Sequence, residues 1–245
     1  CSSDLLRANL LRAVSHDLRT PLTSMIGASS SYLENEAALP PKEKRELVSE
    51  IYEDANWLLH MVENLLSVTR ITDGGASVLK KTPEAAEEVL FDAVSTSRKR
   101  YPDLQIKTVI PDEFVTAPMD PLLIKQVLLN LIENAYFHAR STKPLECTLS
   151  STEDAIKFCI RDYGTGIAPD RLSGIFDAVP SAPSSAASTV DTRKGMGIGL
   201  SICKAIVNAH NGEITARNLT EGAEFCFTIP KEEIHHETYD PNPRH

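Results

Sequence analysis

The chain has no run of apolar residues that approaches the roughly 20 needed to span a bilayer, and no secretory signal peptide is visible. Its five cysteines are an odd number, are scattered, and include no Cys-x-x-Cys pair. This usage favours a reducing cytoplasm over a disulfide framework or a zinc knuckle. Positive charge is also scarce: 25 Lys and Arg against 34 Asp and Glu give a net charge of −9, which argues against unspecific nucleic-acid binding.

What is present fits a globular protein. The length of 245 residues suits one large domain or two modest ones, and 42% hydrophobic with 24% charged residues excludes wholesale disorder. The chain begins at Cys1, without a methionine and already inside a helical pattern. We therefore expect it to be a fragment of a longer protein.

Two helical patterns occupy the first third of the chain. Apolar residues at steps of three and four predict a helix over residues 4–36 and, after the break at Pro40–Pro41, a second one. The two stripes contain Leu11, Val14, Leu18, Leu22 and Met25, and then Leu47, Ile51, Ala55, Leu58, Val62 and Leu65. An antiparallel hairpin cannot bury both stripes by itself, so we expect a homodimer that forms a four-helix bundle.

A different composition follows Asp73-Gly74-Gly75, where strands and helices alternate. We expect strands at 78–82, 105–110, 145–151, 155–161, 213–217 and 223–229, and helices at 84–99, 120–138 and 198–210. A Ser/Ala/Thr-rich segment at 180–194 suggests a mobile loop or lid. The predicted class is α+β: a helical hairpin domain at 1–72, a sheet covered by helices at 78–230, and a polar tail at 231–245.

His16 is the first candidate for chemistry. It falls at the heptad position farthest from the bundle seam, where a solvated imidazole is largely neutral and nucleophilic. Asp17 is adjacent and Thr20 lies one turn on, while Pro21 should bend the helix. Taken alone, His16 is more simply a surface histidine near a tolerated kink.

Asn130 and Asn134 share one face of the helix predicted at 120–138, together with His138. Carboxamide oxygens suit a hard Mg²⁺ ion that bridges phosphates. The alternative is ordinary helix polarity facing solvent, but the leucines and isoleucine around Asn130 make casual placement costly.

Two glycine-rich segments complete the set of motifs. Asp162-Tyr163-Gly164-Thr165-Gly166 ends a strand, where glycines let backbone approach a flat ring and a carboxylate can accept the exocyclic amine of adenine. The run 195–200 leads into a helix, an arrangement that suits phosphates. Each segment is also compatible with a plain turn. A dinucleotide-binding fold is excluded because no strand precedes the second segment.

Together these motifs, in this order, resemble the H, N, G1 and G2 boxes of the sensor histidine kinases of two-component systems. The hexapeptide at 16–21 is similar to their phosphoacceptor box, and the run 130–135 to the N-box shared with gyrase and the Hsp90 chaperones. The resemblance implies ATP and Mg²⁺ as cofactors and His16 as the acceptor, with Asp17 orienting the imidazole and accepting its proton. It implies a nucleotide site of Asn130, Asn134, His138, Asp162, Gly164, Gly166, Gly195, Gly197, Gly199 and Leu200, with Asn130 and Asn134 holding the metal.

The resemblance also implies partners. We expect a response-regulator receiver domain as phosphoryl acceptor, no nucleic acid, and a cytoplasmic location with membrane attachment through segments absent here. Thr20 matches the family's phosphatase motif. Residues 27–31 and 63–70 look most like the potassium-responsive sensor kinases, which implies potassium or osmotic signalling.

Two departures from the family pattern leave alternatives open. Phe137 stands where members often carry a lysine, and the F-box is reduced to Ile175-Phe176-Asp177. A degenerate kinase that docks and dephosphorylates a regulator is therefore one alternative. The other is a water-hydrolysing ATPase, which Asn130 disfavours because that class carries a glutamate at this position.

Overall fold

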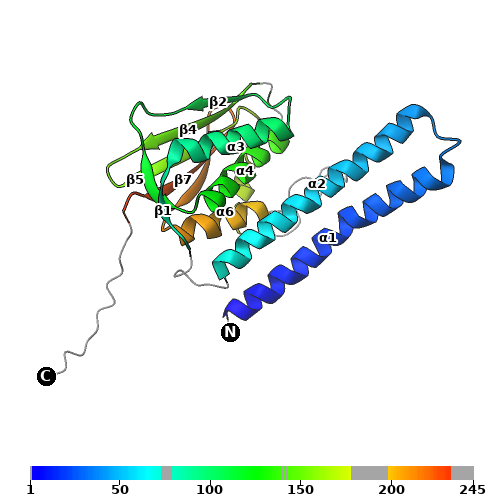
Figure 1. The fold of residues 1–245 in the computed structure, drawn as a ribbon, viewed down its shortest axis with the longest axis horizontal. Coiled ribbons are helices and arrows are strands. Elements are labelled where there is room, and N and C mark those ends of the chain that lie inside the picture. Colours follow the sequence, from blue (N-terminus) through cyan, green and yellow to red (C-terminus); the bar gives the residue numbers. More distant parts are fainter. Residues whose placement is uncertain (1, 73–78, 140, 142, 178–197, 233–245) are drawn as a thin grey trace. The chain divides into compact units, whose positions relative to one another are not determined.

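The computed structural model describes residues 2–72, 79–139, 141, 143–177 and 198–232, and only the backbone at 2–17, 60, 61, 63–72 and 198. The chain divides into two compact units, Cys1–Thr69 and Arg70–His245 (Figure 1). None of the described helices is long and apolar enough to cross a membrane. The predicted tail lies outside the described residues beyond 232, as does the predicted lid.

The first unit is a hairpin of two long helices, α1 (Ser2–Asn35) and α2 (Pro41–Thr72). Pro21 lies inside α1, whereas Pro41 is the first residue of α2, where a proline costs no hydrogen bond. The Ser24 hydroxyl donates to Glu50 Oε1 at 2.9 Å and joins the two helices. The predicted hairpin is confirmed.

Large apolar side chains remain exposed on both helices of the hairpin. Leu33 is 75% exposed and Tyr52 is 69% exposed, and the others are Leu22, Ile26, Val48, Leu59 and Val62. Within each helix these residues recur at helical spacing, so each helix presents an apolar surface that the single hairpin does not cover.

The second unit is built on a five-stranded sheet. Its strand order is β2 (Ile106–Val109), β4 (Leu145–Ser151), β5 (Ala155–Arg161), β7 (Ala223–Pro230) and β6 (Ile214–Asn218). Only the β2–β4 pair is parallel. A separate two-stranded ladder pairs β1 (Thr82–Ala85) with β3 (Thr116–Met119).

Helices cover one face of this sheet: α3 (Ala86–Arg100), α4 (Pro121–His138) and α6 (Ile198–Ala209) (Figure 1). A short helix, α5 (Pro169–Leu172), follows β5. Because strand residues alternate between faces, Phe158 of β5 and Phe227 of β7 are fully buried beneath the helices and stack with their centroids 4.9 Å apart. The opposite face is largely polar, as for Lys157 and Thr228. The α+β class is therefore confirmed.

Two sequence-based expectations fail in this unit. The strand predicted at 78–82 is wrong: β1 begins only at Thr82, and its partner β3 was not expected. Both strands contain a proline, and Pro83 faces Pro118 in the ladder. Cysteine usage also favoured a chain without a disulfide, but Cys159 and Cys226 are bonded to each other, whereas Cys147 and Cys203 are free and buried.

Candidate functional site

The proposed acceptor segment lies on α1. Residues 16 and 20 are one helical turn apart, and the side chains of His16 and Asp17 lie outside the described part of the chain. Thr20 is exposed and Pro21 is buried. Past the proline, the Thr23 hydroxyl donates to the Arg19 carbonyl at 2.8 Å. Thr20 is thus placed at the surface, where a partner could reach it.

Asn130 is positioned by α4, whose N-cap is Asp120. The Asp120 carboxylate accepts from the backbone amides of Leu122 and Leu123 and so fixes the start of the helix. Ten residues on, Asn130 is only 8% exposed, and its Oδ1 accepts from Gln126 Nε2 at 3.2 Å. A carboxamide oxygen is a hard donor of the kind that Mg²⁺ accepts as a ligand.

The N-box helix meets the second glycine segment at Asn130. Its Nδ2 donates to the Gly199 carbonyl in the first turn of α6 at 3.5 Å, a long bond. A side chain at Gly199 would have its Cβ 4.0 Å from Asn130 Cγ. Leu200 is buried next to it, whereas Gly195 and Gly197 lie outside the described residues. Asn134, one turn along α4, is half-buried.

Asp162 is a buried carboxylate at the end of β5, only 5% exposed. Its Oδ1 accepts from the amides of Gly164 at 2.9 Å and Ala223 at 3.2 Å. Gly222, with φ +78°, would place a Cβ 2.1 Å from the Asp162 carbonyl, so a glycine is required there. In the described residues both bonds use Oδ1, which leaves Oδ2 for a ligand's amino group.

The loop after Asp162 is held against two other segments. A Cβ on Gly164 would lie 1.8 Å from the Ala139 carbonyl, so this glycine permits close contact with the end of α4. Gly166 has φ +74°. Asn218 of β6 pairs with the backbone of Ile167 through two bonds of 2.7 Å. Sequence reasoning missed Asn218, because nothing in the sequence indicates that β6 ends beside this loop.

Phe137, at the position where the family often has lysine, belongs to an aromatic cluster. Its ring packs edge-on against Tyr101 at 5.5 Å and Tyr136 at 5.0 Å between centroids. Burial, reinforced by Glu133, raises the pKa of Tyr101, so the cluster is uncharged at neutral pH. Glu133 itself is paired with Arg100 at 2.6 Å, and His138 is exposed at the last turn of α4.

The reduced F-box is attached to the sheet and to α6. Phe176 packs edge-on against Phe225 of β7 with 6.2 Å between centroids. Asp177 accepts from Lys204 of α6 at 3.2 Å. These contacts attach Phe176 and Asp177 to the sheet and to α6 although the second aromatic residue is missing.

His210 links the end of α6 to the start of α4. Its Nε2 accepts from the Asp120 amide at 3.0 Å, so the ring proton is on Nδ1, 2.8 Å from the Ile206 carbonyl. Burial, together with Lys81, lowers the pKa of this 2% exposed side chain. A neutral His210 therefore ties together the two helices that carry Asn130 and Gly199.

These features agree with the comparisons with known proteins, and the chain belongs to the sensor histidine kinases. Residues 6–74 match the family model of the His Kinase A (phospho-acceptor) domain, and residues 119–233 match that of the histidine kinase-, DNA gyrase B-, and HSP90-like ATPase. The residues predicted for the nucleotide site, Asn130, Asp162 and Gly199, lie in the second match, and the predicted acceptor His16 lies in the first.

Two sensor proteins with the same name are similar to this chain over most of its length. Sensor protein KdpD of Clostridium acetobutylicum is 42% identical over 93% of this chain, and KdpD of Escherichia coli is 34% identical over 93%. The chain spans 25% of the length of each of these two relatives. A solved complex of histidine kinase ThkA with response regulator TrrA has the same fold, with a TM-score of 0.68 over 91% of this chain and 61% of that chain, at 21% identity.

Proposed function

We propose that this chain is the catalytic core of a sensor kinase that transfers the γ-phosphoryl group of ATP to His16 and then to an aspartate of a response regulator. The observation that carries the proposal is the buried Asp162 carboxylate, held by the backbone of Gly164 and Ala223. It lies in the same unit as the contact between Asn130 and Gly199.

The nucleotide is bound by groups from three elements. The free oxygen of Asp162 accepts the exocyclic amine of adenine, and Gly164 and Gly166 let the backbone approach the ring. The phosphates bind at the start of α6, near Gly199 and Leu200, with Gly195 and Gly197 supplying backbone amides. His138, at the end of α4, is the remaining residue of the proposed nucleotide site.

Asn130 and Asn134 hold Mg²⁺ through their carboxamide oxygens, a donor set that fits a hard cation. The bound cation supplies neutralisation of the charge on the β- and γ-phosphates. Neither asparagine can deprotonate water, so water is not activated to attack the γ-phosphate. The phosphoryl group can therefore be transferred to a histidine instead. For this reason we favour a kinase over a water-hydrolysing ATPase.

His16 is the nucleophile. A neutral imidazole nitrogen forms a bond to the γ-phosphorus while the bond to the β,γ-bridging oxygen breaks and ADP leaves. Asp17 orients the ring and accepts the proton that the imidazole loses. The phosphoryl group on His16 then passes to a carboxylate of the regulator, which restores the imidazole.

The partners follow from the same assignment. The exposed apolar surfaces of α1 and α2 pair with a second copy to form a four-helix bundle, so the core acts as a homodimer. Thr20, exposed one turn after His16, orients the water that removes phosphate from the regulator. The similarity to KdpD supports potassium or osmotic signalling, in a cytoplasmic domain of a membrane-attached protein.

A regulator-binding phosphatase without kinase activity is the second candidate. It is favoured by Phe137, which packs with Tyr101 and Tyr136, where a lysine could have reached a phosphate. The ordered Asp162 and Asn130 contacts favour the kinase, because a binding module has no need of a nucleotide site.

The test is incubation of the unmodified chain with Mg²⁺ and ATP labelled on the γ-phosphate. We expect protein-bound label that is lost in acid and kept in base, as for phosphohistidine. Bound nucleotide without any such label would instead favour the phosphatase.

A further inference from the structure

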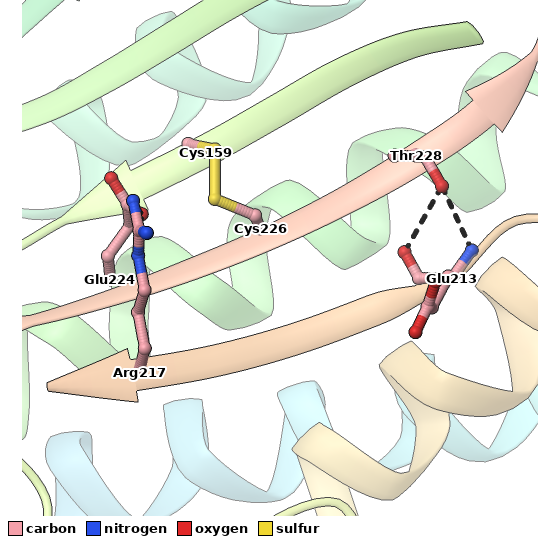
Figure 2. The surroundings of a disulfide bond; sticks show 6 residues. All are labelled: Cys159, Glu213, Arg217, Glu224, Cys226 and Thr228. Carbon is pink, nitrogen blue, oxygen red and sulfur yellow. Dashed lines mark hydrogen bonds and ion pairs between the residues drawn. A yellow bond between two sulfur atoms is a disulfide. The ribbon is translucent and has the colours of Figure 1, made fainter.

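Cys159 of β5 and Cys226 of β7 lie directly opposite each other in the antiparallel ladder, with 4.1 Å between their Cα atoms. Opposite residues of such a ladder point to the same face of the sheet, so the two sulfur atoms meet without any shift of backbone. Figure 2 shows their disulfide crossing from one strand to the other. The bond lies on the sheet face that the helices do not cover, because the neighbours Phe158 and Phe227 face the helices.

The surroundings of Cys159 suit thiol chemistry. Its side chain is partly exposed, so a small molecule can reach the sulfur. Lys157 and Arg161, two residues away in either direction on β5, share its face of the sheet. Cys226, by contrast, is only 5% exposed. Cys159 is therefore the sulfur that an external disulfide reaches when the pair is reduced.

A carboxylate lies within reach of both sulfur atoms. One oxygen of Glu224 and the two sulfur atoms all lie within 4.8 Å of one another. Figure 2 shows Glu224 beside Arg217 of β6, whose Nε donates to Glu224 Oε2 at 2.7 Å. Glu224 is thus held in place and can accept the proton that the buried Cys226 must lose.

The other two described cysteines differ in each of these respects. Cys147 and Cys203 are fully buried on the helix side of the sheet and in α6. Burial raises the pKa of each thiol to about 12, which leaves them protonated and unreactive. They provide matched controls in the same molecule.

The disulfide is close in the ladder to the adenine-binding carboxylate. Three residues beyond Cys159 is Asp162, and three residues before Cys226 is Ala223. The Asp162 amide donates to the Ala223 carbonyl at 2.9 Å, and the Ala223 amide donates to Asp162 Oδ1 at 3.2 Å. A cross-link here limits opening of the strand ends that hold Asp162.

We propose that Cys159 and Cys226 form a reversible thiol–disulfide site that exchanges with small-molecule thiols and disulfides, and that its oxidised form binds nucleotide more tightly than its reduced form. The coupling rests on the proposed function, and the exchange does not. Intracellular disulfides are commonly transient or redox-sensing, so the pair is compatible with a reducing compartment.

The exchange has two steps and passes through a mixed disulfide. The Cys159 thiolate attacks an external disulfide, one external thiolate leaves, and a mixed disulfide forms on Cys159. Cys226 loses its proton and attacks Cys159 Sγ, which releases the second external thiolate. Two protein thiols are oxidised to one disulfide while one external disulfide is reduced to two thiols. Reduction by excess external thiol follows the same steps in reverse.

The exchange is tested on the full chain carrying Cys1→Ser, equilibrated with mixtures of reduced and oxidised glutathione. Free thiols are alkylated in the folded state and located by mass spectrometry. We expect Cys159 and Cys226 to gain and lose label together and reversibly, while Cys147 and Cys203 remain unlabelled throughout. A pair that stays fully oxidised, or fully reduced, across the series would overturn the proposal.

The coupling is tested by calorimetric titration of ADP into the oxidised and reduced chain. We expect ADP to bind about threefold to tenfold more weakly to the reduced form, a difference of about 0.7–1.4 kcal/mol. Cys159→Ser and Cys226→Ser should bind like the reduced form at every glutathione ratio, whereas Cys147→Ala should keep the redox dependence.

Equal affinity of the oxidised and reduced unmodified chain, a comparison that needs no substitution, would overturn the coupling. Absence of ADP binding in both forms, with the exchange intact, would contradict the proposed nucleotide site and with it the coupling, but not the exchange.

Discussion

At the scale of single residues, Asp162 has both a structural role that is seen in the fold and a proposed role in binding adenine. The carboxylate supports its own loop through Oδ1, and in the proposed site its other oxygen accepts a hydrogen bond from the ligand. The substitution Asp162→Asn separates these roles, because the carboxamide keeps an accepting oxygen for the Gly164 and Ala223 amides and replaces the other oxygen by an amino group.

We expect Asp162→Asn to fold normally and to bind ATP about tenfold to a hundredfold more weakly, since a hydrogen bond to a charged group contributes about 1.5–3 kcal/mol. Calorimetric titration gives the affinity, and circular dichroism confirms the fold. Asp162→Ala serves as the comparison, because it also removes the support of the loop. Unchanged affinity in Asp162→Asn would show that this carboxylate does not contact the base.

His210 predicts a pH dependence of stability. Burial lowers its pKa in the folded chain below the unfolded value of about 6.5, so the unfolded state binds more protons in the range between the two. The stabilisation is present above pH of about 6.5 and is lost as the pH falls through that value toward the lowered pKa. Protonation also removes the acceptor for the Asp120 amide.

We therefore expect the free energy of unfolding in urea to fall more steeply below neutral pH for the unmodified chain than for His210→Gln. The glutamine keeps a polar side chain but does not titrate, so the difference between the two curves isolates the histidine. Parallel curves would mean that His210 contributes nothing to the acid sensitivity.

Thr20 makes the third prediction at this scale. Its side chain is exposed one turn after residue 16, and a hydroxyl there can orient water toward a regulator's phosphoaspartate. Thr20→Ala should lower regulator dephosphorylation by about tenfold or more, the order of effect of a lost positioning group, with autophosphorylation nearly unchanged. Both rates are followed with labelled phosphate, and equal losses would assign Thr20 a purely structural role.

At the scale of elements, segments with a clear apolar pattern could be predicted from sequence, whereas two short strands that contain proline could not. The expected helix at 120–138 and the strands at 145–151 and 155–161 agree closely with α4, β4 and β5, because their apolar patterns extend over several turns or alternations. β1 and β3 each have four residues, with one proline, and become strands only by pairing with each other.

The same reasoning explains which parts of the site were not predicted. The four motifs mark Asn130, Asp162 and Gly199 individually, but their contacts depend on how distant elements pack. The bond between Cys159 and Cys226 spans 67 residues of sequence and requires the register of β5 against β7, which no local pattern encodes. The pairing of Asn218 with Ile167 has the same origin.

The hairpin carries the prediction at the element scale. Leu59 and Val62 of α2 are 54% and 45% exposed in the single hairpin, although they are large and apolar. A second copy that covers them would remove this surface from water. Leu59→Glu combined with Val62→Glu should therefore convert the dimer to a monomer in light scattering, with helix content largely retained.

Lys42→Glu is the matched control, because this side chain is 88% exposed at the other end of α2. An unmodified chain that is already monomeric at micromolar concentration would contradict the bundle.

At the scale of the whole molecule, the proposed acceptor and the proposed nucleotide site belong to different compact units. His16 lies in the unit Cys1–Thr69, and Asn134 and Asp162 lie in the unit Arg70–His245. Substitutions in one unit should therefore leave the function of the other intact. Substitutions that remove the acceptor and the nucleotide site separately therefore distinguish their two roles.

The most direct test of the central claim compares His16→Gln with Asn134→Ala, using ATP affinity and transfer of labelled γ-phosphate in parallel. His16→Gln should bind ATP like the unmodified chain and take up no phosphate, because the nucleotide site is complete and only the nucleophile is missing. Asn134→Ala should lose both, because a proposed ligand of Mg²⁺ is removed. Label that persists on His16→Gln would contradict the account by placing the acceptor elsewhere.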